Sequence, residues 1–205
     1  MAEEKITGHA RVETNNLLMI VLILLVVAVG GLVEIVPLFF QKSTTQPIAG
    51  MQPYTAAQVV GRDIYIREGC NNCHSQMVRH LLSESLRYGP YSVAGESVYD
   101  HPHLWGSKRT GPDLARVGGR YSDDWHRVHM INPRDVVPES NMPAYPWLEK
   151  TPANVRSVQR HMRGLRTLGA PYSDEDIANA PAELEGQSEL DVLIAYLQGL
   201  GVHRR

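Results

Sequence analysis

Two cysteines and a histidine stand close together in the sequence, as Cys70-Asn-Asn-Cys73-His74. Thiols at this spacing can add to the two vinyl groups of one haem, and the histidine that follows is then held beneath the iron as an axial ligand. A redox-active thiol pair needs a βαβ setting, whereas a helix is predicted before this motif. A structural zinc site needs four ligands, and the chain has only these two cysteines. The motif therefore predicts one covalent haem c.

The ligand on the opposite side of the iron is sought among seven methionines. A methionine opposite a histidine raises the potential of haem iron and suits electron transfer. Met77 is too near His74 in the chain to cross the ring, and Met130 falls in a predicted helix. Met142 precedes a proline in an extended loop, which suits a sulfur held over the haem. We predict Met142 as the ligand and Met130 as the alternative, while gap-filling in the core is the ordinary role open to each.

Other residues near the motif are candidates for supporting the haem. The carbonyl of Pro112 could accept the Nδ1 proton of His74, which would orient the ring and raise its basicity. Arginine pairs bidentately with carboxylates, so Arg109 is a candidate for the haem propionates. Trp105 and Tyr121 are candidates for the haem edge.

Helix start and stop signals indicate the elements that position these residues. Thr55 and Gln58 form a capping-box pattern for the helix that leads to the motif, and Gly69 is a candidate stop. The predicted helices span roughly 55–68, 78–88, 122–131, 151–169, a short stretch from 173, and 188–200. The helix at 151 is expected to have Pro152 in its first turn. No strand or internal repeat is predicted, so the fold class is all-α with long ordered loops.

A long apolar segment precedes this domain. No charged residue occurs from Leu17 to Val33, and a helix extended to Phe40 is about 36 Å long, enough to span a bilayer. A cleaved signal peptide is the alternative. The mixed-charge residues before the segment and the lack of a small-x-small site after it favour a retained transmembrane anchor. Glu34 lies near one end, where it can reach the headgroups, and its role stays open.

The charge balance excludes one class of partner. The chain has 20 basic and 22 acidic residues, and the acidic excess falls in the first 40 residues, so the remainder is formally neutral. Nucleic-acid binding usually needs a strongly basic face, so no nucleic-acid partner is expected. A run of arginines is interpreted as a solvated helix face, with a docking patch as the alternative: Arg156, Arg160, Arg163 and Arg166.

The motif also predicts the side of the membrane. In bacteria, haem is attached to such motifs on the outer side of the inner membrane, so the haem domain is expected in the periplasm. The predicted organisation is a cytoplasmic N-terminus and anchor at 1–41, a linker at 42–54 and a periplasmic mono-haem domain at 55–205.

Several short patterns resemble class I cytochromes c. They are Gly61-x-x-x-Tyr65 before the haem motif, Gly-Pro-x-Leu at 111–114, Met-Pro at 142–143 and Leu-Ile-Ala-Tyr-Leu at 193–197. The resemblance implies that the first and last helices of the domain cross near Gly61 and Tyr196, where the glycine lets the backbones approach.

Three longer segments resemble the mono-haem subunit of cbb3-type cytochrome c oxidases: YIREGCNNCHSQMVR at 65–79, WGSKRTGPDLARVGG at 105–119 and VPESNMPAYPWL at 137–148. The resemblance covers essentially the whole chain. It implies attachment of haem c to Cys70 and Cys73 and axial ligation by His74 and Met142. It also suggests a calcium ion near the interface, touching Gly106-Ser107.

The same resemblance implies an activity and partners. Electrons from a di-haem cytochrome c subunit, or from soluble cytochrome c, pass toward haem b of the catalytic haem–copper subunit, where oxygen is reduced with proton pumping. The excursion at 75–109 is a candidate surface for docking on that subunit. Two alternatives stay open. A free-standing membrane-anchored carrier would purify alone, and a haem sensor or peroxidase-like enzyme would bind carbon monoxide.

Overall fold

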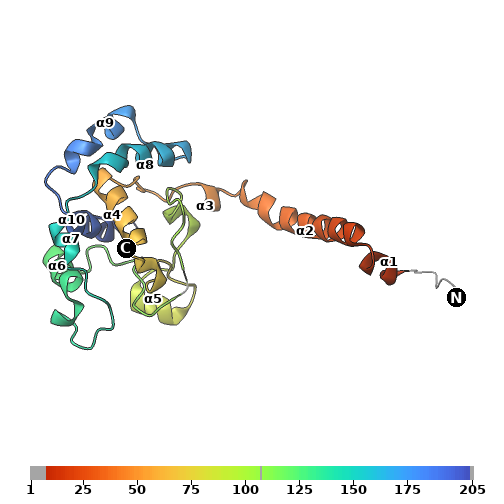
Figure 1. The fold of residues 1–205 in the computed structure, drawn as a ribbon, viewed down its shortest axis with the longest axis horizontal. Helices are drawn as coiled ribbons and strands as arrows, with labels where there is room; N and C mark the ends of the chain where they lie inside the picture. Colours follow the sequence, from red (N-terminus) through yellow and green to blue (C-terminus); the bar gives the residue numbers. More distant parts are fainter. Residues whose placement is uncertain (1–7, 107, 204–205) are drawn as a thin grey trace. The chain divides into compact units, whose positions relative to one another are not determined.

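The computed structural model describes residues 8–106 and 108–203 of the chain. The chain divides into two compact units, Met1–Gln46 and Pro47–Arg205. Helices and loops make up both units, and the described residues contain no strand beyond an isolated bridge between Pro152 and Ser188 (Figure 1). The predicted all-α fold class is confirmed.

The first unit contains α1 (His9–Glu13), α2 (Asn16–Leu38) and α3 (Lys42–Thr45). The Asn15 side chain caps α2 by accepting a hydrogen bond of 3.0 Å from the backbone N–H of Leu18. None of the α2 side chains is buried against the chain, although nearly all are apolar. Among the described helices, α2 is the one long and apolar enough to cross a membrane.

The second unit holds the remaining helices. They are α4 (Ala56–Arg67), η1 (Cys70–Asn72), α5 (Leu82–Tyr88), η2 (Ala94–Glu96), α6 (Asp123–Ile131), η3 (Pro133–Asp135), α7 (Trp147–Lys150), α8 (Val155–Thr167), α9 (Asp174–Glu183) and α10 (Glu189–Gly199). A single hydrophobic core joins α4 and α10 to the buried faces of α6, α8 and α9. Long loops connect the short helices between α4 and α7 (Figure 1).

The centre of this core is the crossing of α4 with α10. A Cβ atom on Gly61 would lie 2.0 Å from the carbonyl oxygen of Val192 and 2.8 Å from Cβ of Tyr196, so only glycine allows the two backbones to approach. Tyr65 and Tyr196 are both fully buried, with their rings edge to face at 5.4 Å. The crossing that the resemblance implied is present.

A second helix pair covers another side of α4. The inner face of α8 buries Val158 and Met162, and His161 of the same helix pairs with Asp63 of α4. The four arginines of the run described above lie on α8 and are exposed. One of them, Arg166, donates a hydrogen bond of 2.6 Å to Asp174 at the start of α9.

Two predicted helix starts are wrong. The helix expected from Thr151-Pro152 begins at Val155, with Asn154 as its cap, because Pro152 instead pairs with Ser188 in the isolated bridge. The helix expected from Val78 begins at Leu82, because the backbone N–H and carbonyl of Val78 bond to Ser92 at 3.0 and 2.9 Å, respectively. In both cases a distant segment uses the backbone groups that a helix would need.

Candidate functional site

The cysteine motif follows directly from α4. Thr55 and Gln58 form the predicted reciprocal capping box at its start. Gly69 ends the helix with a left-handed φ of 73°, and the chain turns through η1 with the backbone N–H of His74 bonding to the carbonyl of Cys70 at 2.9 Å. This single turn brings both thiols and the imidazole to one end of α4.

The Cys70 thiol is poorly suited to disulfide exchange. Burial, followed by the negative charge of Glu68, raises its pKa to about 12. A redox-active cysteine requires the opposite, a lowered pKa that supplies thiolate at neutral pH. The environment therefore argues against a thioredoxin-like thiol pair.

His74 is oriented by the loop at 111–114. Its Nδ1 lies 2.8 Å from the carbonyl oxygen of Pro112, and burial lowers its pKa while this hydrogen bond opposes the shift. A neutral imidazole with Nδ1 donating to a carbonyl presents Nε2 as a free metal ligand. A Cβ on Gly111 would lie 2.2 Å from Cε1 of His74, so the backbone can lie against the ring only because residue 111 is glycine.

A buried polar network fastens the segment after His74 to this loop. Asp113 is fully buried, and its carboxylate accepts hydrogen bonds from the Ser75 hydroxyl at 2.6 Å, the Met77 N–H at 2.9 Å and the Ala115 N–H at 2.9 Å. Three donors satisfy this carboxylate, so the network fixes the chain on both sides of the imidazole.

Arg109 belongs to the same network. Its guanidinium donates to Glu84 at 2.9 Å and to the Met77 carbonyl at 2.9 Å, and it also bonds to Ser75 and lies 3.5 Å from Asp113. These partners occupy its donors. The structure therefore uses Arg109 to brace the loops, rather than leaving it free for a haem propionate as the sequence suggested.

The stability that Glu84 contributes through its ion pair with Arg109 is expected to depend on pH. Hydrogen bonds from Arg109 and then Arg79 lower its pKa from 4.5 to about 2, against the opposing effect of burial. Its stabilising effect is therefore complete above pH 4.5 and is lost as the pH falls toward 2. We expect Glu84→Gln to lower the free energy of unfolding at pH 7 by roughly 2 kcal/mol, with the difference from wild type shrinking below pH 4.5.

The measurement is denaturant unfolding of the full chain in detergent across this pH range. Glu175→Gln, a change at an exposed position on α9, is the matched control and should follow the wild type. A Glu84→Gln difference that stays constant with pH would show that the carboxylate charge is not the cause.

The candidates for the haem edge have different surroundings. Trp105 is 39% exposed, stacks on His103 at 4.5 Å and donates its indole N–H to Ser97 at 3.2 Å. Tyr121 is equally exposed and stacks on Trp125 at 4.1 Å. Ser107, the candidate calcium contact, lies outside the described residues.

The two candidate methionines lie in different environments. Met130 on α6 is 8% exposed and belongs to the hydrophobic core. Met142 lies in the loop before α7 and is only partly buried against that core. The Tyr145 N–H holds this loop by donating to the carbonyl of Met130 at 2.8 Å, and burial followed by the nearby Cys70 raises the pKa of Tyr145. Tyr145, three residues after Met142, thus lies within electrostatic reach of Cys70.

Sequence reasoning missed two histidines on α6. His126 is 2% exposed, and burial lowers its pKa. Burial, then His126 and His74, lower the pKa of His129 to about 4, so His129 lies within electrostatic reach of the motif histidine. Two histidines three positions apart in a predicted helix were the signal that could have identified them.

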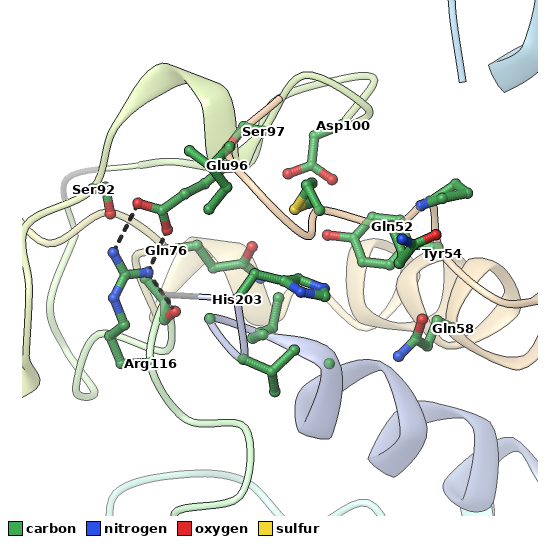
Figure 2. A pocket seen from close by; sticks show the side chains of 18 of the residues that line it. Gln52, Tyr54, Gln58, Gln76, Ser92, Glu96, Ser97, Asp100, Arg116 and His203 are labelled. Atoms are coloured by element: carbon green, nitrogen blue, oxygen red, sulfur yellow. Dashed lines mark hydrogen bonds and ion pairs between the residues drawn. The ribbon is translucent and has the colours of Figure 1, made fainter. Parts of the chain in front are cut away.

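A separate pocket of about 290 Å³ lies between the segment at 48–58, the loop at 92–100 and the end of α10. Figure 2 shows Asp100 and Tyr54 on one side of it and the Arg116–Glu96 ion pair on the other. None of the motif residues lines this pocket. It is therefore distinct from the site around His74.

The fold and the site together define a class of protein. A helix ends in Cys-x-x-Cys-His, the C-terminal helix crosses it at a glycine, and a proline carbonyl lies at the motif histidine. This combination is typical of class I cytochromes c.

The family model described as "Cytochrome C oxidase, mono-heme subunit/FixO" matches residues 9–189, and the chain belongs to this family. The protein is thus a cytochrome c subunit of a cbb3-type oxidase, which is an oxidoreductase complex, and one haem is implied. Together with α2, the family indicates a membrane-anchored protein. No curated protein matches the chain.

The residues of the site fit a haem. Two thiols and one imidazole lie in a single turn, and the imidazole has its Nδ1 engaged by Pro112. Because residue 111 is glycine, its backbone can lie directly against that ring. A partly buried thioether, Met142, lies three residues before Tyr145, whose pKa is affected by the charge of Cys70. Thiols can add to the vinyl groups of a c-type haem, and an imidazole and a thioether can bind its iron.

Proposed function

We propose that this chain is the non-catalytic electron-relay subunit of a proton-pumping cbb3-type terminal oxidase. Electrons arrive from a di-haem cytochrome c subunit or soluble cytochrome c and leave toward haem b of the catalytic haem–copper subunit. The hydrogen bond between His74 and Pro112 is the observation that carries the proposal, because it leaves a neutral imidazole with one nitrogen free for iron. When bound, the haem supplies a one-electron iron couple.

The chain holds the haem through four side chains in this proposal. Cys70 and Cys73 form the two thioethers, and His74 and Met142 are the axial ligands. The electrostatic effect of Cys70 on Tyr145, three residues after Met142, and the partial exposure of Met142 support this choice. Met130 is already used in the core, where methionine commonly fills gaps.

We place the domains on opposite sides of a bacterial inner membrane. Residues 1–41 form the cytoplasmic N-terminus and the single-pass anchor, 42–54 the linker and 55–205 the periplasmic haem domain. The support is the exposed apolar surface of α2 and the chemistry of the motif, because haem is attached on the periplasmic side.

The excursion at 75–109 is the proposed surface for the catalytic subunit. The ion pair of Arg109 with Glu84 braces this segment, and Tyr99 and Leu104 pack it against the core of the domain. On the outer side of α5, Leu82 and Leu86 are 77% and 78% exposed. A freely diffusing carrier has no need of a long ordered segment that exposes leucine side chains.

Purification of the full chain in mild detergent tests this function. A relay subunit is expected to migrate with b-type haems and with copper. Migration as a lone c-type cytochrome would instead identify a free membrane-anchored carrier. Binding of carbon monoxide by the reduced c-type haem would contradict methionine ligation and identify a sensor or peroxidase-like protein.

Covalent attachment gives a further prediction. We expect Cys73→Ser to lose one thioether and the double change of Cys70 and Cys73 to serine to release all haem on acid–acetone extraction. The readout is the haem left on the protein after extraction. Asn71→Ser alters the spacer but keeps both thiols, so it should retain its haem. Full retention by the double variant would refute attachment at these cysteines.

A further inference from the structure

Asp113 is joined to both groups that meet at the motif histidine. It directly follows Pro112, whose carbonyl oxygen lies 2.8 Å from Nδ1 of His74. Its carboxylate also accepts a hydrogen bond of 2.6 Å from the hydroxyl of Ser75, the residue after His74. The side chain of Asp113 has no exposed surface. This one buried carboxylate therefore connects the imidazole with the acceptor of its proton.

The direction of the Pro112 carbonyl depends on the neighbours of this proline. Pro112 has no backbone N–H and cannot hold itself in place by donating a hydrogen bond. Its carbonyl belongs to the planar peptide unit that ends at the Cα atom of Asp113, so fixing Asp113 helps to fix the direction of the carbonyl. The Asp113 carboxylate accepts from the Ala115 N–H in its own loop and from the Met77 N–H in the facing segment, each at 2.9 Å. Asp113 thus orients the acceptor that meets Nδ1.

Two backbone hydrogen bonds also join these segments. The Gly111 N–H donates to the carbonyl of Cys73 at 3.0 Å, and the Leu114 N–H donates to the carbonyl of Ser75 at 2.8 Å. Neither bond involves the peptide unit between Pro112 and Asp113. Loss of the carboxylate would therefore leave the segments together, while the Pro112 carbonyl would be free to tilt away from the ring.

A buried charge is not required merely to brace two loops. Taking a carboxylate out of water is costly, and replacing a buried ion pair by apolar groups is often neutral for stability. Arg109 lies 3.5 Å from Asp113 but is shared with Glu84, which lies 2.9 Å from the same guanidinium. The negative charge of Asp113 is thus only partly offset, one residue away from the carbonyl at His74. This position favours a role in tuning the ligand.

We infer that Asp113 is a positioning residue that acts on His74 through the Pro112 carbonyl and lowers the potential of the haem bound there. The inference rests on the proposed function, since it requires that haem. A firm hydrogen bond from Nδ1 to a carbonyl raises the basicity of the imidazole as a ligand. A more basic ligand and a nearby negative charge both favour the oxidised iron, which carries the greater positive charge.

A redox titration of the full chain, purified in detergent with its covalent haem, tests this inference. Asp113→Asn keeps the shape of the side chain, removes its charge and turns one acceptor oxygen into a donor. The equilibrium constant for haem reduction is expected to shift about tenfold toward the reduced form, as for the loss of about one hydrogen bond. The largest g value in the electron paramagnetic resonance spectrum of the ferric haem should also change, because it depends on the axial ligands.

Ser75→Ala keeps the test decisive if Asp113→Asn does not fold. It removes one donor to the carboxylate but keeps the charge and both backbone donors, so a smaller change in the same direction is expected in both readouts. Wild-type values in Ser75→Ala would then overturn the inference.

Glu96→Gln is the matched control. Glu96 is a carboxylate with a side chain only 12% exposed, it pairs with Arg116 at 2.6 Å, and it lies in the pocket that none of the motif residues lines. This variant should lose stability but keep the wild-type potential and g values. Equal changes in Asp113→Asn and Glu96→Gln would overturn the inference, because lost stability alone would explain them.

The remaining outcomes separate the inference from the function. Covalent haem with wild-type potential and g values in Asp113→Asn would overturn the inference and leave the relay function standing. A shifted potential with unchanged g values would contradict action through the Pro112 carbonyl, because it would indicate the charge alone. A wild-type chain without covalent haem would overturn the function itself.

Discussion

Replacing Met142 by alanine is expected to lower the haem potential more than any other change in the domain and to open the iron to external ligands. A thioether favours reduced iron, and methionine opposite histidine raises the potential of haem. Because the residue lies in a loop and is only partly buried, its removal should leave the fold nearly intact. The measurements are a redox titration of the c-type haem and carbon monoxide binding to its reduced form.

Met130→Leu is the control for this prediction. Leucine keeps the volume of a core methionine, which usually costs less than about 1.5 kcal/mol, and removes the only other sulfur near the site that we considered as a ligand. This variant should keep the wild-type potential. If Met130→Leu exposes the iron while Met142→Ala does not, the ligand is Met130 and the assignment is reversed.

Gly61→Ala should have the largest effect on stability. The added methyl group would lie 2.0 Å from the carbonyl oxygen of Val192 and 2.7 Å from its carbonyl carbon, so the backbones of α4 and α10 would have to separate. Overpacking of this kind costs about 3 kcal/mol. Because α4 also presents the cysteine motif, the yield of covalent haem should fall together with the unfolding midpoint.

A second glycine tests whether the cause is the helix crossing. Gly164 lies in α8, and nothing stands within 4 Å of a Cβ built there. Gly164→Ala should therefore stabilise the chain by up to about 1 kcal/mol through helix propensity. Equal destabilisation by the two changes, measured by denaturant unfolding, would contradict the crossing argument.

The sequence predicted the helices that carry their own start signals. The capping boxes at Thr55, Ser173 and Ser188 are all present, because a side chain and a backbone N–H three residues apart decide them locally. The starts at Val78 and Pro152 were missed because distant residues, Ser92 and Ser188, occupy their backbone groups. The four-residue helix α7 gives no periodic signal and was not predicted.

Part of the candidate site could likewise be predicted from the sequence, and part could not. The cysteine motif is readable because two additions to one porphyrin require a fixed spacing along the chain. The surroundings of Arg109 and of the α6 histidines were not readable. They depend on which partners a donor finds after folding. The fold gives Arg109 a carboxylate from α5, whereas one nitrogen of each α6 histidine has no hydrogen-bond partner among the described residues.

The sequence by itself thus determined the chemistry that the chain can perform, since thiol, imidazole and apolar anchor follow from residue types at short spacings. Only the tertiary structure decided which groups support that chemistry. The close approach at Gly61 and the carbonyl at His74 each join residues far apart in the sequence. Such contacts form when the helices pack, and no local pattern specifies them.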